Sequence, residues 1–313
     1  MRSDTNTAAP SPLVPASRHR RTLLAFTALL AIFASMAGVL IQLSGSNPAL
    51  PQAPAPPPGG GNPGHRTRLA SGAARFGRSL RRPLGIPGDW HLILNQTFDG
   101  PSLDSSVWRP GWFGNGVTGP VNRDERACYN PANLHFSAHG LAFLVTHRRS
   151  RCSNRTEPYT GALISTNPYD GRRSGGFQFR YGVVQADVYL PATHGLLADW
   201  PVVMALGHNW PRDGEDDILE GLGGVACHTF HNRSGQAIGC DRWLSPGWNV
   251  VAVDWQPHAV TYYYDGIRVG TVTRGVTHSP EYLVVLNTVS RRFPKAIISD
   301  SMRVSYVRVW TRG

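Results

Sequence analysis

The chain has 313 residues and a formal net charge of +11, a length that allows one large domain or two ordinary ones. The charge is unevenly placed, because the residues up to Gly88 include ten arginines and a single acidic residue, Asp4. The remainder is therefore close to neutral and lacks the concentrated basic surface that nucleic-acid binding requires. We expect no nucleic-acid partner for the folded part.

Residues 1–44 have the features of an export signal. Residues 1–21 are polar and end in Arg18-His19-Arg20-Arg21, whereas residues 22–44 are mostly apolar and uncharged. About 20 such residues span a bilayer, and basic residues before them favour a cytoplasmic N-terminus. We predict a cytoplasmic tail at 1–21 and a transmembrane signal anchor at 22–44. A cleaved signal peptide is the alternative, since Ser35-Met36-Ala37 would serve as a cleavage motif. Both interpretations export the rest of the chain, either as the extracellular part of a single-pass cell-membrane protein or as a secreted protein.

Residues 45–88 are rich in Pro, Gly, Ala and Arg. Such a composition cannot bury enough apolar surface to fold, and it is typical of an extended tether. We predict a disordered linker over 45–88. Its basic stretch at 66–82 is interpreted as part of this solvated linker.

Residues 89–313 consist of short β-rich runs separated by Gly, Pro and Asn, and contain no long segment of helical periodicity. Asp265-Gly266 predicts a hairpin turn between two of these runs. Many strands in one domain of this length indicate an all-β sandwich. The clearest predicted strands are 141–146, 182–190, 250–255, 259–264 and 282–287.

The stretch from Glu215 to Glu220 contains four acidic residues around an Ile-Leu pair. As a strand, its alternation puts Glu215 and Asp217 on one face, and an extra bulged residue would bring Glu220 to that face and turn Leu219 inward. Three carboxyl groups on one face can supply the nucleophile and the acid that retaining glycoside hydrolysis uses. The alternative is a short helix that ends at Gly221.

The signature Trp-Pro-x-x-Gly-Glu-x-Asp-x-x-Glu at residues 210–220 resembles the active site of glycoside hydrolase family 16 in its bulged, laminarinase-like form. The resemblance implies Glu215 as nucleophile, Asp217 as its helper and Glu220 as acid/base. It also implies a jelly-roll β-sandwich of two antiparallel sheets with a concave glycan-binding cleft. Similar segments follow one another in the family's order at 98–108, 159–164, 181–191, 247–255, 260–266, 282–287 and 303–310.

The implied function is a retaining endo-β-glycanase, with a β-1,3-glucan as the default polysaccharide substrate. Two alternatives use the same sandwich: a cell-wall transglycosylase, in which a sugar hydroxyl replaces water, and a carbohydrate-binding domain without activity. No cofactor and no metal are needed for the chemistry. A structural calcium occurs in related proteins, but we do not predict one, because Ser305 stands where an aspartate is often found. We expect a monomer that contacts polysaccharide and, through residues 22–44, the membrane.

Glycan binding requires aromatic faces for stacking and polar groups for hydroxyls. Trp210 is the best candidate platform because it lies beside the signature. For Trp200 and Trp112, and for the weaker candidates Asn287 and Glu125, packing or hydrogen bonding within the fold is an equal alternative. The resemblance implies that His231 faces the substrate, with a structural role as the alternative.

Three residues depart from the family pattern. Asp216 occupies a usually aliphatic position that faces the interior, where an unpaired carboxylate is costly. We therefore predict an arginine, histidine or tyrosine hydrogen-bonded to Asp216. Met204 replaces a usual stacking residue, and Arg123 adds a cation at the expected rim of the cleft, so both put the glucan specificity in question.

The four cysteines all follow the export signal, and an even count there favours two disulfides. Three pairings are possible. Closeness in sequence favours Cys128 with Cys152 and Cys227 with Cys240.

Overall fold

The computed structural model describes residues 80–313 except 114–115, 170–174, 242–243 and 292–299. The predicted cytoplasmic tail, signal anchor and most of the linker lie outside these residues. Among the residues described, no helix has the length and apolar character needed to cross a bilayer.

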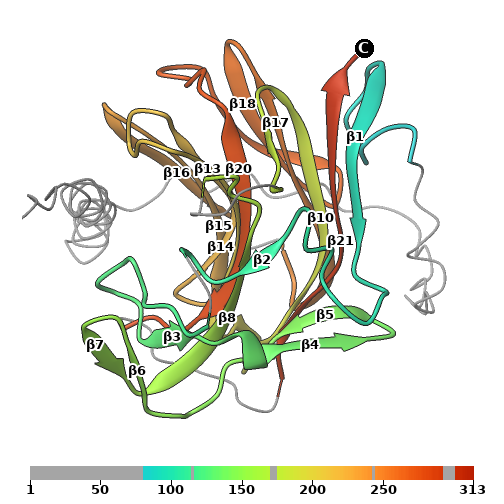
Figure 1. Ribbon diagram of the computed structural model, residues 1–313. Coiled ribbons are helices and arrows are strands. Elements are labelled where there is room, and N and C mark those ends of the chain that lie inside the picture. The colour runs from blue at the N-terminus through green and yellow to red at the C-terminus, as the bar shows by residue number, and fades with distance from the viewer. Residues whose placement is uncertain (1–79, 114–115, 170–174, 242–243, 292–299) are drawn as a thin grey trace, which may run out of the picture.

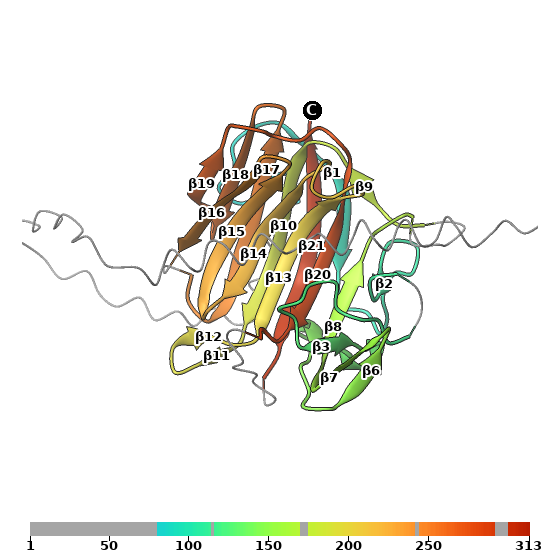
Figure 2. The same cartoon turned by 90° about the vertical axis from the view of Figure 1, so that its left-hand side faces the viewer.

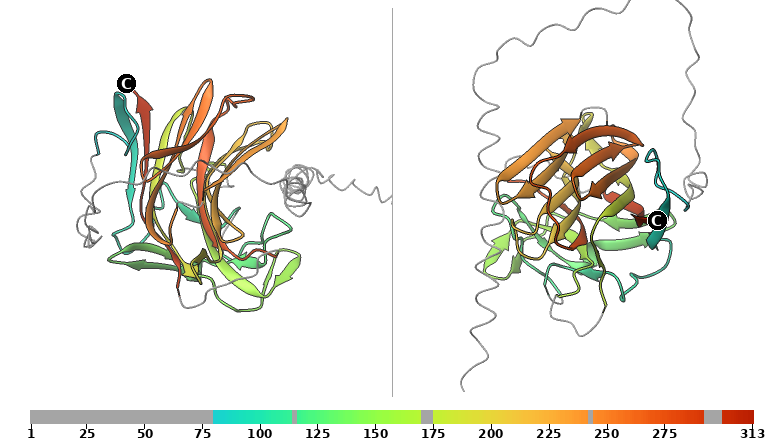
Figure 3. Two further views of the ribbon diagram at one scale, coloured as in Figure 1. Left: turned by 180° about the vertical axis from the view of Figure 1, so that it is seen from behind. Right: turned by 90° about the horizontal axis from the view of Figure 1, so that it is seen from above.

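In the described part, two large, mainly antiparallel sheets pack face to face, as Figure 1 shows. The first sheet has the order β19-β18-β17-β10-β21-β5-β4, with β1 also paired to β21 near the C-terminus (Figure 3). Its strands are β1 (Trp90–Thr97), β4 (Leu134–Ser137), β5 (Gly140–Phe143), β10 (Gly182–Leu190), β17 (Gly247–Gln256), β18 (Ala259–Tyr264), β19 (Ile267–Val272) and β21 (Met302–Arg312).

The second sheet has the order β16-β15-β14-β13-β20-β8-β2, with β3 paired to β8 and β9 paired to β20. Figure 2 shows its outer face. Its strands are β2 (Arg109–Pro110), β3 (Ala127–Tyr129), β8 (Tyr159–Ser165), β9 (Gln178–Phe179), β13 (Trp200–Gly207), β14 (Glu215–Leu222), β15 (Val225–Asn232), β16 (Gly235–Asp241) and β20 (Glu281–Thr288). The smaller elements are η3 (Pro131–Asn133) and the hairpins β6 (Ser150–Cys152) with β7 (Arg155–Glu157) and β11 (Ala192–Thr193) with β12 (Leu196–Leu197).

The core lies between the two sheets and follows from strand alternation. On β10, Val184, Ala186 and Val188 belong to the main hydrophobic cluster, whereas Gln185 hydrogen-bonds on the other face. A second apolar cluster lies on the outer face of the β14-containing sheet and includes Trp112, Trp200, Met204 and Tyr282. This sheet is therefore apolar on both faces beside its acidic strand.

The all-β sandwich predicted from the sequence is confirmed. Each of the five clearest predicted runs contains a strand, although the strand expected at 141–146 ends at Phe143. The predicted hairpin also forms, because Asp265 and Gly266, with φ of 51° and 81°, join β18 to β19. Positive φ at both residues fits the twist of a tight hairpin.

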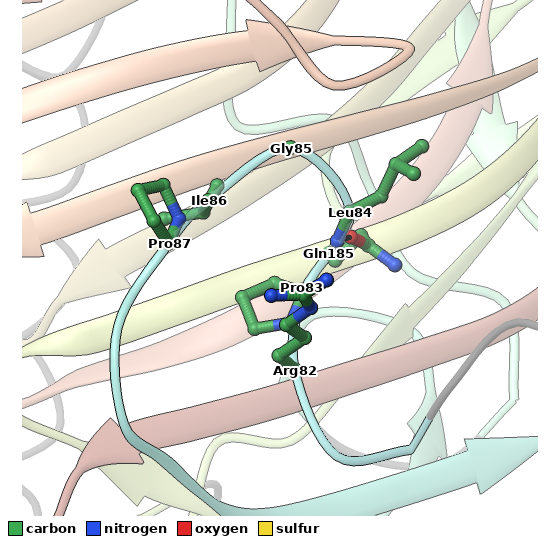
Figure 4. A pocket seen from close by; sticks show the side chains of 7 residues that line it. All are labelled: Arg82, Pro83, Leu84, Gly85, Ile86, Pro87 and Gln185. Carbon is green, nitrogen blue, oxygen red and sulfur yellow. Dashed lines mark hydrogen bonds between the residues drawn. The ribbon is translucent and has the colours of Figure 1, made fainter.

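The prediction of a disordered linker up to Gly88 is wrong for its last residues. Residues 82–87 arch over Gln185 on the outer face of β10 and line a cavity of about 390 Å³ with it (Figure 4). The Leu84 backbone N–H donates to Gln185 Oε1 at 2.7 Å, and Ile86, 2% exposed, packs with Trp90 and Trp310. Trp310 Nε1 also donates to the Leu80 carbonyl at 3.1 Å. Composition alone hid this because one isoleucine and two hydrogen bonds to backbone groups suffice to attach so short a segment.

Both predicted disulfides are confirmed. Cys128 is bonded to Cys152, and Cys227 is bonded to Cys240. The second bond joins directly opposed residues of β15 and β16. It therefore fixes the pairing of the two strands that follow the acidic strand.

Ile86→Ala should lower the free energy of unfolding of the domain by about 2–4 kcal/mol, since it removes a fully packed side chain. Leu80→Ala is the matched control, because Leu80 is 48% exposed and such surface changes usually stay within about 0.5 kcal/mol. Urea unfolding of a fragment that begins shortly before Leu80 and runs to Gly313 measures both changes in the free energy of unfolding. Equal effects of the two substitutions would show that the segment does not pack as described.

Candidate active site

Strand β14 carries the acidic signature between β13 and β15. Its register against β15 shifts between Asp217 and Glu220, where Ile218 and Leu219 together oppose the single residue His228. Both Ile218 and Leu219 are fully buried in the core. The predicted bulge is thus confirmed, and its consequence is that Glu220 shares a face with Glu215 and Asp217.

A tight turn before β14 aims the first of these residues. Asp213 Oδ2 accepts hydrogen bonds from the backbone and side-chain N–H groups of Asn209, at 3.1 and 2.6 Å, and the Gly207 N–H donates to the Gly214 carbonyl at 2.9 Å. Gly214 has a φ of 95°, and a Cβ there would lie 2.8 Å from Glu281 Oε1. The signature glycine is therefore required by both backbone and space.

Glu215 is completely buried and has one donor. Trp210 Nε1 donates to Glu215 Oε2 at 2.6 Å. The other oxygen, Glu215 Oε1, has no hydrogen-bond partner among the described residues. A carboxylate with one oxygen fixed and one free is suited to nucleophilic attack.

The other two carboxyl groups contact strand β15. Asp217 Oδ2 lies 3.2 Å from His231 Nε2, and Thr229 Oγ1 donates to Glu220 Oε2 at 3.2 Å. Cys227, bonded to Cys240, stands directly opposite Glu220. Alternate residues of β15 thus face the carboxyl groups, as alternation requires.

Burial raises the pKa of all three carboxyl groups. For Glu220 it raises the pKa to about 8, with the charge of Asp217 as the second cause. The pKa of Glu215 is also well above its ordinary value, through burial and the charge of Asp217, while His231 and the Trp210 hydrogen bond favour its anion. The pKa of Asp217 is raised by burial and by the charge of Asp216. Because like charges this close cannot all persist, the site holds protons at neutral pH.

Glu215, Asp217 and His231 each place one oxygen or nitrogen within 4.8 Å of the others. Three such atoms could hold a cation, and Trp210 already donates to Glu215 Oε2.

The structure places the aromatic candidates on the same face as the carboxyl groups. Trp112 and Trp200 are 3% and 5% exposed within the outer apolar cluster, which also includes Met204. Trp210 is partly buried against that cluster, 6.3 Å from the ring of His231. Trp210, His231 and Trp200 are thus the candidates that the structure brings to the carboxyl groups, with Trp200 beside Glu220.

Two other candidates make their hydrogen bonds elsewhere. Asn287 is completely buried and donates to the Phe143 carbonyl and to Asp199 Oδ2. Glu125 is buried and accepts from the Tyr129 hydroxyl at 2.5 Å. These contacts favour the alternative of hydrogen bonding within the fold over contact with a substrate.

The predicted partner of Asp216 is confirmed. Asp216 faces the interior, and the Tyr262 hydroxyl of β18 donates to its Oδ1 at 2.9 Å. Two residues of the site, Thr229 and Glu281, were not predicted from the sequence. Thr229 could have been found, because a residue two positions before His231 shares its face if this segment is a strand, as β15 is. Glu281 carries no local signal.

No protein-family model matches the chain, and no curated protein does. Solved structures do match. The laminarinase catalytic domain from Thermotoga maritima has a TM-score of 0.59 at 20% identity, over 72% of this chain and 99% of that one. The endo-β-1,3-glucanase from Pyrococcus furiosus has a TM-score of 0.59 at 22% identity, over 72% and 95%.

A third structure is a non-specific endo-β-1,3(4)-glucanase from family GH16, with a TM-score of 0.59 at 21% identity, over 74% of this chain and 95% of that one. The fold is therefore that of the family 16 laminarinases. At such identities the likeness extends to the fold alone. What the domain does must be argued from its own residues.

Trp210→Phe should move the acidic limb of the pH–activity profile upward by about one pH unit, because it removes a hydrogen bond to a charged group. The donor lost is the Trp210 N–H on Glu215, and its loss favours the protonated form of Glu215. Trp112→Phe is the control, since Trp112 Nε1 has no partner among the described residues. An unmoved limb in Trp210→Phe would refute the role of this N–H.

Proposed function

We propose that the domain is a retaining endo-β-glycanase. The observation that carries the proposal is the bulge in β14, which aligns Glu215, Asp217 and Glu220 on one face while Trp210 fixes one oxygen of Glu215. A binding domain needs neither three buried carboxyl groups nor a donor aimed at one of them. Buried acids with raised pKa values are typical of catalytic sites.

In the first step, Glu215 Oε1 attacks the anomeric carbon and the glycosidic bond breaks. Glu220 gives its proton to the departing oxygen, and a glycosyl ester forms on Glu215. In the second step, Glu220 takes a proton from water, whose oxygen attacks the same carbon and releases Glu215. Electron pairs and protons balance over the two steps, and no further reactant is needed.

The environments of the two glutamates support these roles. The Trp210 N–H stabilises the anion of Glu215 that a nucleophile requires, and it opposes the burial and the charge of Asp217, which raise the pKa of Glu215. Burial holds the pKa of Glu220 at about 8, so Glu220 keeps its proton at neutral pH. Asp217, 3.2 Å from His231, lies between the two glutamates, and its charge raises the pKa of both.

For the substrate, we propose a β-1,3-glucan. The support is the fold shared with a laminarinase and with endo-β-1,3-glucanases. Met204 in the apolar cluster beside the site is the feature that argues for testing other glycans as well. Transglycosylation would use the same first step with a sugar hydroxyl in place of water.

We further propose that the domain works outside the cell, tethered through residues 22–44 or secreted. The support is the uncharged apolar segment in the sequence and the two disulfides of the described domain. Disulfides persist in oxidising, extracytoplasmic environments.

Glu215→Gln should abolish turnover without unfolding the domain, because an amide cannot form the glycosyl ester. The test is incubation with β-1,3-glucan, mixed-linkage glucan, β-1,4-galactan-type algal polymers and bacterial wall glycans, with products sized by mass spectrometry. Shortened products from the wild type alone would support hydrolysis, and longer products transglycosylation. Activity retained by Glu215→Gln would refute the assignment of the nucleophile.

Glu220→Gln should lower kcat by about 10²–10⁴-fold on a natural glycan, the usual contribution of general acid catalysis. On an aryl glycoside, whose leaving group needs no proton, the first step should largely survive. Azide, a small nucleophile that needs no general base, should then restore turnover and give a β-glycosyl azide. Isothermal titration with an oligosaccharide serves as the control for intact binding. Absence of both the aryl-glycoside reaction and azide rescue would contradict the acid/base role.

The pH dependence follows from the same residue. Glu220 must hold its proton to act as the acid, and its pKa is raised to about 8. Activity is thus expected at neutral pH, with kcat/KM falling as pH rises through about 8. In Glu220→Gln this alkaline fall should be absent from the pH profile of the aryl-glycoside reaction. An alkaline limb of the wild-type kcat/KM profile near the ordinary pKa of a glutamate would contradict the assignment of Glu220 as the acid.

A further inference from the structure

A second pair of carboxyl groups lies behind the catalytic strand. Asp216 of β14 and Glu281, the first residue of β20, are 1% and 0% exposed and face each other in the interior between the sheets. Neither belongs to the face that carries Glu215 and Glu220. The chemistry described above uses neither of them.

Each carboxyl group of the pair has one oxygen satisfied by the fold. Asp216 Oδ1 accepts from the Tyr262 hydroxyl at 2.9 Å, and Glu281 Oε1 accepts from Thr277 Oγ1 at 3.4 Å. The remaining oxygens, Asp216 Oδ2 and Glu281 Oε2, have no donor among the described residues. The two side chains are nevertheless within hydrogen-bonding reach of each other.

Two carboxylates cannot hydrogen-bond to each other without a proton, because both are acceptors only. One proton between them would satisfy both remaining oxygens at once. Two ionised carboxylates in contact, without water, would instead carry the full cost of buried like charges. We propose that Asp216 and Glu281 share a single proton, and that this hydrogen bond holds the catalytic strand β14 in place from behind.

The ionisable groups around the pair do not offset two negative charges, so a bound proton is the means by which one charge is neutralised. Those that act on it from the surrounding strands are Glu215 and Asp217 on β14, His231 on β15 and Tyr262 on β18. Glu215 and Asp217 are carboxyl groups that would add negative charge beside the pair. The Tyr262 hydroxyl donates a hydrogen bond to Asp216 but carries no positive charge. Among the described residues, no arginine or lysine contributes to either shift.

The pKa values point in the same direction. Burial raises the pKa of Asp216 to about 7, while the Tyr262 hydroxyl opposes the shift. Burial and the charge of Asp216 raise the pKa of Glu281 well above its ordinary value. The folded protein therefore binds more protons here than the unfolded chain, and this contribution to stability falls as pH rises above the ordinary carboxyl range.

The pair is placed to position the nucleophile without touching substrate. Asp216 lies between Glu215 and Asp217 in the chain, and Glu281 Oε1 would be 2.8 Å from a Cβ at Gly214, the residue just before Glu215. Loss of the shared proton would put two repelling charges against this turn and strand. Asp216 and Glu281 are thus positioning residues, and their catalytic consequence rests on the proposed glycanase function.

The first test is the pH dependence of thermal stability in the wild type, Glu281→Gln, Asp216→Asn and the double variant. Each amide supplies the missing N–H donor permanently. Glu281→Gln should therefore lessen the fall in Tm between about pH 6 and about pH 9 by roughly 5 °C relative to the wild type. Asp216→Asn should lessen it equally, and the double variant should gain nothing more.

This non-additivity distinguishes one shared proton from two independently buried acids, whose effects on the slope would add. Additive slopes, or slopes unchanged in both single variants, would overturn the proposal. Glu281→Leu is the matched control, because it leaves Asp216 Oδ2 unpaired. It should lower Tm at every pH at which it folds, and a Tm equal to that of Glu281→Gln would also refute the shared hydrogen bond.

The second test measures positioning. Glu281→Gln should retain kcat near neutral pH, whereas Glu281→Leu should lose at least about tenfold in kcat with little change in KM, since small displacements of a reacting group cost much rate. Equal kcat in the two variants would refute the positioning role. An inactive wild type would remove the glycanase proposal, yet the Tm slopes would still decide whether the proton is shared.

Discussion

The site depends on one extra residue in β14. Without the bulge opposite His228, strict alternation would send Glu220 into the core and Leu219 out to the carboxyl face. With it, Ile218 and Leu219 are both fully buried in the main cluster. The apolar pair therefore fixes the register that brings the acids together, because exposing either side chain would cost about 1.5–3 kcal/mol. Core packing and site geometry are here set by the same two side chains.

Much of this could be predicted from the sequence, since the signals are local. Alternation located the strands, an acidic run interrupted by Ile218 and Leu219 required a bulge, and the spacing of the cysteines gave both disulfides. The family resemblance marks Asp216 as an unusual interior acid, and the cost of burying a charge alone predicts an arginine, histidine or tyrosine partner, of which the structure has the tyrosine. Each of these features is determined by a few neighbouring residues or by one physical rule, such as the cost of burying a charge.

What could not be predicted depends on contacts distant in sequence. Glu281 meets Asp216 only because β20 and β14 flank β13, and nothing in the residues around Glu281 indicates an acid turned inward. Asn287 and Glu125 were weak candidates, and their buried hydrogen bonds to Phe143 and Tyr129 come from tertiary packing. Composition predicts a linker up to Gly88, because it does not show that Gln185 offers an acceptor to the Leu84 N–H.

The two faces of β14 therefore pose the same electrostatic problem and meet it differently. On the outer face, a tryptophan donates to Glu215, a threonine donates to Glu220, and a histidine lies at ion-pair distance from Asp217. These contacts allow one of the three acids to ionise. On the inner face, Asp216 and Glu281 have two hydroxyl donors, and among the described residues no arginine or lysine offsets a second charge. A charge needed for reaction is stabilised by fixed dipoles. Two buried carboxyl groups that serve only structure are better stabilised by one shared proton, which leaves a single negative charge. Acids on adjacent positions of one strand can thus serve opposite purposes, because the pleat separates their surroundings.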